Sequence, residues 1–229
     1  MTAQDQTADI AWRDGVVPVS TRFDDPYFSL SGGLAETRHV FLAGNALPAR
    51  LQDGFRIAEL GFGTGLNLLA TALAFAATGQ PGQITYTAFE AYPMTAPDIA
   101  RALDAFPETT PLVADFVRQW RDGPRVTLPG LSAEIILGDA RKTLPGWGGH
   151  ADAWYLDGFS PAKNPQMWEP DLMAQVAAHT APGGTFATYT AAGFVRRALQ
   201  AAGFQIQRRP GFGTKRHMTA GQLPPDRIP

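Results

Sequence analysis

The chain has 229 residues, of which 45% are hydrophobic and 17% are charged, a composition typical of one compact domain with additions rather than of a disordered chain. It contains no cysteine, which excludes disulfides, zinc-thiolate sites and thiol nucleophiles, and its four histidines are scattered without metal-ligand spacing, so we expect no metal site. No apolar run reaches the roughly 18–20 residues that span a bilayer, and the first residues lack a signal-peptide pattern. We therefore expect a cytoplasmic protein without a membrane partner.

Charge is distributed unevenly along the chain, although the formal net charge is only −2. Residues 1–150 carry 11 Lys and Arg against 16 Asp and Glu, whereas residues 151–229 carry 8 against 5. The stretch 172–225 contains no acidic residue. This pattern indicates either a basic face that meets phosphates or a solvated helix face and strand edge. The candidate phosphate contacts are Arg196, Arg197, Lys215 and Arg216.

Residues 1–50 form an extension rich in aromatic residues, Gly, Ser and Asp. They include the run V-P-V-S-T-R-F-D-D-P-Y-F-S and the strand-like run R-H-V-F-L at 38–42. We expect a β-rich hairpin or lid beside a ligand cleft, although turn-forming and packing roles suit the same residues equally well. The polar candidates in this extension are Asp24, Asp25, Tyr27, Glu36 and Asn45.

The stretch R-I-A-E-L-G-F-G-T-G-L-N at 56–67 predicts a strand, a tight glycine turn and the start of an apolar helix. Its glycines permit positive φ and close approach of a ligand, and the helix behind them presents unpaired N–H groups. The dinucleotide fingerprint would need a glycine where Leu66 stands. The E-x-G-x-G-x-G spacing instead resembles the first motif of the Rossmann-like methyltransferases that bind S-adenosylmethionine, and a turn without a ligand is the alternative. The cofactor candidates here are Glu59, Gly61, Phe62, Gly63, Thr64, Gly65 and Asn67.

Acidic residues end the next two predicted strands. Ile84–Glu90 reads as a strand, and Glu90 lies about 25 residues beyond the glycine turn, close to the roughly 20 expected of an acid that takes the two ribose hydroxyls. The run 125–139 predicts two strands about a Pro-Gly turn, the second of which ends at Asp139. By resemblance to the same methyltransferases, Asp139 and Ala140 lie beside the adenine ring. Asp139 is equally suited to cap the helix that follows.

The segment 95–120 predicts helix in two pieces, broken near Pro107 and Pro111. The run D-A-W-Y-L-D at 152–157 predicts a strand that leads into the loop D-G-F-S-P-A-K-N-P-Q-M-W, where two prolines exclude helix and favour an extended course. The carboxyl end of a strand beside the switch point of a doubly wound sheet faces the ligand, so Asp157 and Phe159 are the catalytic candidates. Asp157 would act as a base or as an orienting group. The substrate-binding candidates nearby are Tyr27, Lys163, Asn164 and Trp168, although single aromatic residues more often belong to a core.

A helix near residue 170, a strand at 184–190, a helix at 192–201 and closing strands near 204–209 and 215–219 complete the pattern. We expect an α/β, Rossmann-like class I methyltransferase fold with a seven-stranded mixed sheet. The predicted divisions are an extension or lid at 1–50, a methyltransferase domain at 51–221 and a frayed tail at 222–229.

The longer motifs resemble those of the methyltransferase component of the bacterial tRNA 5-methylaminomethyl-2-thiouridine enzymes, known as MnmC or MnmD. These motifs are S-x-R-F-D-D-P-Y-F-S, G-L-A-E-T-x-x-V-F-L-x-G-N, I-A-E-L-G-F-G-T-G-L-N, D-A-W-Y-L-D-G-F-S-P-A-K-N-P-Q-M-W, A-G-F-V-R-R-x-L and G-F-G-x-K-R. The block that begins at Asp157 is the most specific, and Ser160 and Gln166 depart only mildly from the expected Ala and acid. The resemblance implies S-adenosylmethionine-dependent methylation of the 5-aminomethyl group of a (2-thio)uridine at the tRNA wobble position.

Bifunctional members of this family also carry a flavin-dependent oxidase domain, for which we expect no room in a chain that ends at Pro229. The resemblance therefore implies methyl transfer without flavin or metal, tRNA as partner and a separate flavin oxidase acting upstream. Two other functions stay open: methyl transfer to a small-molecule amine, which the acidic net charge suits, and a cofactor-binding accessory protein without catalysis.

Overall fold

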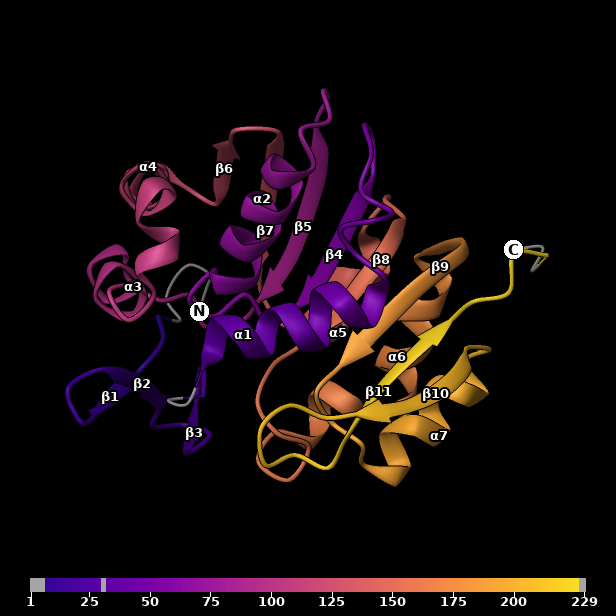
Figure 1. Ribbon diagram of the computed structural model, residues 1–229. Helices are drawn as coiled ribbons and strands as arrows, with labels where there is room; N and C mark the ends of the chain where they lie inside the picture. The colour runs from indigo at the N-terminus through magenta and orange to yellow at the C-terminus, as the bar shows by residue number, and fades with distance from the viewer. Residues whose placement is uncertain (1–6, 30–31, 227–229) are drawn as a thin grey trace.

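The computed structural model describes residues 7–29 and 32–226, which form a central sheet covered by helices on both faces, with a small sheet beside it (Figure 1). The central sheet has eight strands in the order β10-β11-β9-β8-β4-β5-β7-β6. Five neighbouring strands, from β9 to β7, are parallel, while β10 and β11 at one edge and β6 at the other are antiparallel. The strand bounds are β4 Arg56–Leu60, β5 Ile84–Glu90, β6 Arg125–Leu128, β7 Leu131–Leu137, β8 Ala151–Leu156, β9 Thr180–Thr188, β10 Gln205–Pro210 and β11 His217–Gln222.

This mixed sheet confirms the predicted α/β fold class, but it has one strand more than the seven expected. The additional strand is β6, which pairs antiparallel with β7 across the Pro-Gly turn. Gly130 in this turn has φ 70°, and a Cβ there would lie 2.8 Å from the ring of Phe75, so both backbone and packing require glycine. The hairpin seen in the sequence therefore widens the sheet by one strand at its edge.

Two sets of helices cover opposite faces of the central sheet (Figure 1). The helices α2, α3 and α4 share one apolar cluster with strands of the sheet, and α5, α6 and α7 share the second. Parallel strands need this cover because both of their faces are buried. The helix bounds are α2 Leu66–Thr78, α3 Ala96–Leu103, α4 Thr110–Asp122, α5 Ala140–Thr143, α6 Pro170–Ala178 and α7 Gly193–Ala201.

The N-terminal extension begins with a three-stranded antiparallel sheet that is fastened to the main domain. The amide of Ala8 donates to the carbonyl of Pro93 at 2.9 Å, and the guanidinium of Arg101 lies 3.9 Å from the ring centroid of Trp12. The strand β3 leads directly to the cavity described below. The strand bounds are β1 Ile10–Arg13, β2 Val17–Ser20 and β3 Asp25–Pro26.

The second half of the extension is helical, which corrects the prediction of a strand at 38–42. The helix α1 spans Gly33–Thr37 and continues as a π-helix over Arg38–Leu42 and a 3₁₀ turn over Ala43–Asn45. The apolar run at 40–42 is buried, and a Cβ on Gly44 would lie 2.6 Å from Cβ of Ala187 in β9. A short apolar run fits helix and strand alike, and here packing against the sheet decides for helix.

Two boundaries differ from the prediction for local reasons. The chain breaks at the 3₁₀ turn Pro107–Thr109 as expected, but Pro111 lies in the first turn of α4, where a missing N–H costs nothing. Strand β11 continues to Gln222, and the buried Leu223 donates its N–H to the carbonyl of Gly184. The predicted tail from 222 is therefore ordered at its start, and its last three residues, 227–229, lie outside the described residues.

Candidate functional site

A cavity of about 410 Å³ lies at the carboxyl end of the parallel strands, at the point where the strand order reverses between β4 and β8. Leu60 and Leu156 are register partners in these two strands, so Gly61 and Asp157 leave the sheet side by side. Doubly wound sheets bind their ligands at such a switch point. The predicted site residues that line the cavity are Tyr27, Gly61, Phe62, Gly63, Thr64, Asn67, Glu90, Asp139, Ala140, Asp157, Phe159, Asn164 and Lys215.

The glycine corner between β4 and α2 lines the cavity with two of its three glycines, Gly61 and Gly63. Gly61 has φ 82°, and a Cβ there would meet Cα of Gly158 at 3.0 Å. Gly63 has φ 56° and faces the ring of Tyr27. Gly65 differs from the prediction: it does not line the cavity, and a Cβ there would lie 2.6 Å from the ring of Phe116. Glycine is required at this position by the left-handed backbone of the α2 N-cap and by packing, not by a ligand.

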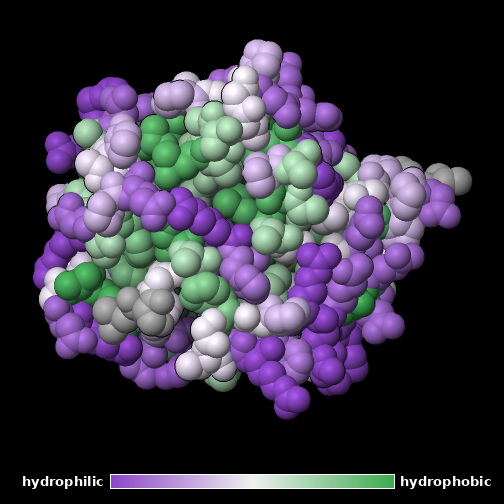
Figure 2. Space-filling view, in the orientation of Figure 1, coloured by the Kyte–Doolittle hydropathy of each residue, from purple (hydrophilic) through white to green (hydrophobic). Residues whose placement is uncertain are grey.

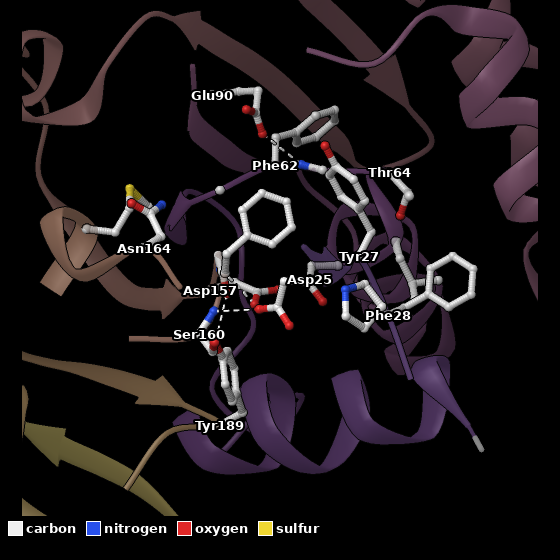
Figure 3. A pocket seen from close by; sticks show the side chains of 18 of the residues that line it. Asp25, Tyr27, Phe28, Phe62, Thr64, Glu90, Asp157, Ser160, Asn164 and Tyr189 are labelled. Carbon is white, nitrogen blue, oxygen red and sulfur yellow. Dashed lines mark hydrogen bonds between the residues drawn. The ribbon is translucent and has the colours of Figure 1, made fainter. Parts of the chain in front are cut away.

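Glu90 at the end of β5 holds the glycine corner in place. Its carboxylate accepts from the amide of Gly63 at 2.9 Å (Figure 3). It also accepts from the amide of Tyr92 at 2.7 Å. Burial raises the pKa of Glu90, and the backbone hydrogen bonds oppose that shift. Each carboxylate oxygen has a second lone pair, so the group retains the capacity to accept from two hydroxyls.

Asp139 at the end of β7 does cap a helix, as one of its two predicted roles required. Its carboxylate accepts from the amide of Arg141 at 3.0 Å at the start of α5, and it forms an ion pair with the guanidinium of Arg141 at 2.6 Å. These contacts lower the pKa of Asp139, so it is ionised at neutral pH. Asp139 and the buried Ala140 also line the cavity.

Glu59 is placed differently from the prediction, because its side chain is fully buried and lies beneath the cavity rather than in its wall. One oxygen accepts from the amide of Asn67 at 2.6 Å, and the other accepts from the hydroxyl of Tyr86 at 2.8 Å. Burial, followed by the nearby Asp157, raises the pKa of Glu59 well above its usual value. Glu59 therefore acts on the site through Asn67 and has no direct access to a ligand in the cavity.

Asn67 connects Glu59 to Asp157. Its Nδ2 donates to Glu59 and also to Asp157 at 2.8 Å, while its Oδ1 accepts from the hydroxyl of Thr37 at 2.8 Å. This set of partners fixes the orientation of the amide, since only the NH₂ end can serve two carboxylates. The first turn of α2 is thereby tied both to the extension and to the end of β8.

Asp157 is the carboxylate at the centre of the cavity (Figure 3). Besides the bond from Asn67, it accepts from the amide of Gly158 at 2.8 Å. Burial raises the pKa of Asp157 to about 6, against the lowering effect of these two hydrogen bonds and of Lys215. At neutral pH the group is therefore ionised, yet it is a stronger base than an aspartate in water.

Aromatic rings from the extension and the 157–168 loop pack together at the cavity. Phe159 stacks on Phe23 with ring centroids 4.8 Å apart and meets Tyr27 edge-on at 5.0 Å. Tyr92 contacts Phe23 from the other side. Phe23 and Tyr92 were missed in the sequence, although Phe23 lies inside the R-F-D-D-P-Y-F motif that pointed to the extension.

The extension is also joined to the loop by polar contacts. Asp25 accepts from the amide of Ser160 at 2.7 Å, and Asp24 forms an ion pair with Lys163. Lys163 does not line the cavity, so its predicted contact with substrate is not supported by its position, whereas Asn164 does line it. The loop turns through a 3₁₀ helix at Pro165–Trp168 instead of staying extended.

Trp168 is likewise not placed as a stacking surface. It is 1% exposed, and its indole N–H donates to the carbonyl of Phe159 at 3.0 Å. Tyr189 packs edge-on against it and donates its hydroxyl to the carbonyl of Gly158 at 2.8 Å. Both residues hold the backbone of the loop, and Tyr189 additionally lines the cavity, a role that the sequence analysis missed.

The predicted basic residues divide into two groups. Lys215 lines the cavity and pairs with Glu36 at 2.7 Å, whereas Arg196, Arg197 and Arg216 lie outside it. They belong to α7 and the β10–β11 loop, a region over which hydrophilic side chains gather (Figure 2). The pKa of His217 is lowered first by partial burial and then by Arg208, Arg216 and Arg196, so these three arginines lie near His217.

A glycine corner after the first central strand, a carboxylate at the end of the next and a switch-point cavity define a Rossmann-like enzyme that binds a nucleoside cofactor. The family model described as S-adenosyl-L-methionine-dependent methyltransferase matches residues 105–224, which is more than half of the chain. The chain belongs to this family. Its cavity fits such a cofactor, because Gly61, Gly63 and the carboxylate of Glu90 line it and a carboxylate has lone pairs that can accept from hydroxyls.

Similarity to individual relatives indicates a narrower group of proteins than the family model does. The chain is 45% identical, over 94% of its length, to the tRNA 5-methylaminomethyl-2-thiouridine biosynthesis bifunctional protein MnmC of Caulobacter sp. (strain K31), and 43% identical, again over 94%, to that of Aeromonas salmonicida (strain A449). It covers 38% and 35% of these proteins, so it spans little more than a third of their length. The crystal structure of MNMC2 from Aquifex aeolicus superposes with a TM-score of 0.74 at 25% identity, covering 98% of this chain and 74% of that one.

Among the described residues, 7–29 and 32–226, none of the helices has the length and hydrophobicity of a membrane span. Within the same ranges, no group of three or more His, Asp and Glu side chains is arranged to hold a metal ion.

Proposed function

We propose that this chain transfers the methyl group of S-adenosylmethionine to the nitrogen of a 5-aminomethyl-(2-thio)uridine at the tRNA wobble position, without the flavin oxidase step. The observation that carries the proposal is a carboxylate of raised pKa, Asp157, held by Asn67 and Gly158 at the switch point of a methyltransferase fold. The similarity to MnmC proteins over 94% of the chain supports the choice of acceptor.

The cofactor would occupy the cavity between the ends of β4, β5 and β7. Glu90 would accept from the two ribose hydroxyls, and Asp139 with Ala140 would border the adenine ring. The glycine corner, with Gly61 and Gly63, would face the methionine part. Bound S-adenosylmethionine supplies a methyl group activated by a sulfonium.

Asp157 would prepare the acceptor nitrogen. A primary alkyl amine has a pKa near about 10, like lysine, so it arrives as an ammonium and must lose a proton before it can attack. Asp157, with a pKa of about 6, orients this ammonium and accepts its proton. The freed nitrogen would then take the methyl group that the bound cofactor supplies, which gives a secondary ammonium and S-adenosylhomocysteine, and Asp157 would release to solvent the proton that it accepted.

The aromatic cluster would hold the uracil ring. A base that undergoes chemistry must leave its stack, and rings such as Phe159 and Tyr27 offer a surface for it. The cationic surface with Arg196, Arg197 and Arg216 would contact phosphates on the RNA that flanks this base. A separate flavin oxidase would produce the aminomethyl group upstream.

The decisive experiment incubates the chain with bulk tRNA from cells that lack this modification and with methyl-labelled S-adenosylmethionine. We expect label in 5-methylaminomethyl-(2-thio)uridine after nuclease digestion. A catalytically inactive accessory protein would bind the cofactor and leave the tRNA unlabelled. An enzyme for small-molecule amines would ignore the tRNA and label a low-molecular-weight amine fraction instead. Either of these two results refutes the proposal.

A further inference from the structure

Lys215 extends from the β10–β11 loop into the wall of the cavity. Its Nζ lies 2.7 Å from an oxygen of Glu36 and 4.4 Å from the ring centroid of Tyr189. The Glu36 side chain, on α1, is only 13% exposed, whereas that of Lys215 is 45% exposed. Tyr189 is held separately by its hydrogen bond to Gly158. The carboxylate and the ring thus belong to the fixed wall, and the ammonium belongs to a long, half-exposed side chain.

These contacts define the chemistry of the subsite. A carboxylate and an aromatic face are the two groups that stabilise an ammonium in a partly dry pocket. The end of a lysine side chain is an ammonium on a methylene group. A protonated 5-aminomethyl substituent is the same chemical group. The Lys215 ammonium therefore makes the contacts with Glu36 and Tyr189 that the ammonium of an acceptor would make.

The surrounding charges favour exchange of one cation for another. Among the described residues that line the cavity, Lys215 is the single cation, and five carboxylates line the same cavity. Glu36 and Lys215 lie close enough to Asp157 to act on its pKa, which Lys215 lowers and Glu36 raises. If Lys215 withdrew without replacement, Glu36 would keep an uncompensated charge against a mostly buried wall. The five carboxylates are Asp25, Glu36, Glu90, Asp139 and Asp157.

We infer that Glu36 and the ring of Tyr189 form the subsite that receives the ammonium of the acceptor, and that Lys215 fills this subsite until the acceptor displaces it. The inference rests on the proposed function and adds the group that selects an aminomethyl substituent. A neutral substituent at the same position gains nothing from the Glu36 carboxylate. The subsite lies beside Asp157, where the ammonium is then deprotonated.

The test measures binding of two anticodon stem-loop RNAs, one with 5-aminomethyluridine and one with unmodified uridine, to the full chain saturated with S-adenosylhomocysteine. The wild type should prefer the aminomethyl RNA by about 10- to 100-fold, the range of a hydrogen bond to a charged group. Glu36→Gln, which keeps the shape and removes the charge, should abolish most of this preference. Glu108→Gln is the matched control, because Glu108 pairs with Arg38 at 2.6 Å on the surface and is 61% exposed.

Lys215→Met provides an independent measurement, since it removes the ammonium from the subsite and leaves an uncharged side chain of similar length. This variant should keep the preference or increase it, because the acceptor no longer competes with the lysine. The inference is overturned if Glu36→Gln retains the wild-type preference, if it weakens both RNAs equally, or if Lys215→Met loses the preference. These results are distinct from a failure of the proposed function, in which the wild type itself would neither methylate tRNA nor prefer the aminomethyl RNA.

Discussion

Asn67→Ala tests whether the hydrogen bond from α2 sets the basicity of Asp157. In the wild type, Asn67 Nδ2 donates to Asp157 at 2.8 Å and lowers its pKa, which burial has raised to about 6. A hydrogen bond to a charged group contributes about 1.5–3 kcal/mol, and one pKa unit corresponds to about 1.4 kcal/mol. Loss of the bond would therefore raise the pKa of Asp157 by about 1–2 units, and by about half of that if water enters the partly exposed cavity and replaces the amide.

The assay is the pH dependence of methyl transfer to tRNA at saturating cofactor. Protonated Asp157 cannot accept a proton, so activity should fall in the wild type as the pH drops through about 6. In Asn67→Ala this acid limb should move to higher pH by about 0.5–1 unit. Asn164→Ala serves as control, because Asn164 also lines the cavity but is not among the groups that shift the pKa of Asp157.

An acid limb that stays in place in Asn67→Ala, or moves to lower pH, would refute this account of Asp157. Asn67 also donates to the buried Glu59, so its removal weakens the fold, and the melting temperature of each variant is measured alongside. Thr37→Val offers a milder change, since it removes only the hydroxyl that donates to Asn67 Oδ1 at 2.8 Å. It should shift the acid limb in the same direction by a smaller amount.

Three further predictions follow from burial, packing and charge. The pKa of Asp157 is about 6 in the folded state and about 4 in the unfolded state, so the contribution of Asp157 to stability falls as the pH rises from about 4 to 6. Asp157→Asn should therefore raise the melting temperature at pH 8 but not at pH 4. The same variant should abolish methyl transfer. Gly65→Ala combines a left-handed backbone with a Cβ 2.6 Å from Phe116, and urea denaturation should show a loss of about 2–5 kcal/mol. Charge reversal of Arg196 and Arg197 should raise the KM for tRNA and flatten the salt dependence of that KM. The affinity for S-adenosylhomocysteine, measured by calorimetry, should stay unchanged. Equal KM values in variant and wild type would show that this surface does not contact RNA.

The sequence by itself determined the parts of the fold that depend on local pattern. Alternating glycines after a short apolar strand require the corner at Gly61 and Gly63, because few other residues adopt its positive φ angles. The strand end and its distance from the glycine turn predict Glu90, and resemblance to the same methyltransferases predicts Asp139; both line the cavity. The second half of the N-terminal extension is harder to predict, because the apolar run at 40–42 is too short to show a period that separates helix from strand.

Only the tertiary structure decided which side chains reach the cavity. Glu59 and Trp168 are of the residue types expected in a binding site, but they are 0% and 1% exposed, and each positions a neighbouring residue by a hydrogen bond. The Lys215–Glu36 pair joins residues 179 positions apart, and the Ser160–Asp25 bond joins residues 135 positions apart. Contacts over such separations arise where chain segments meet at the end of the sheet, and the spacing of residues along the sequence does not predict them.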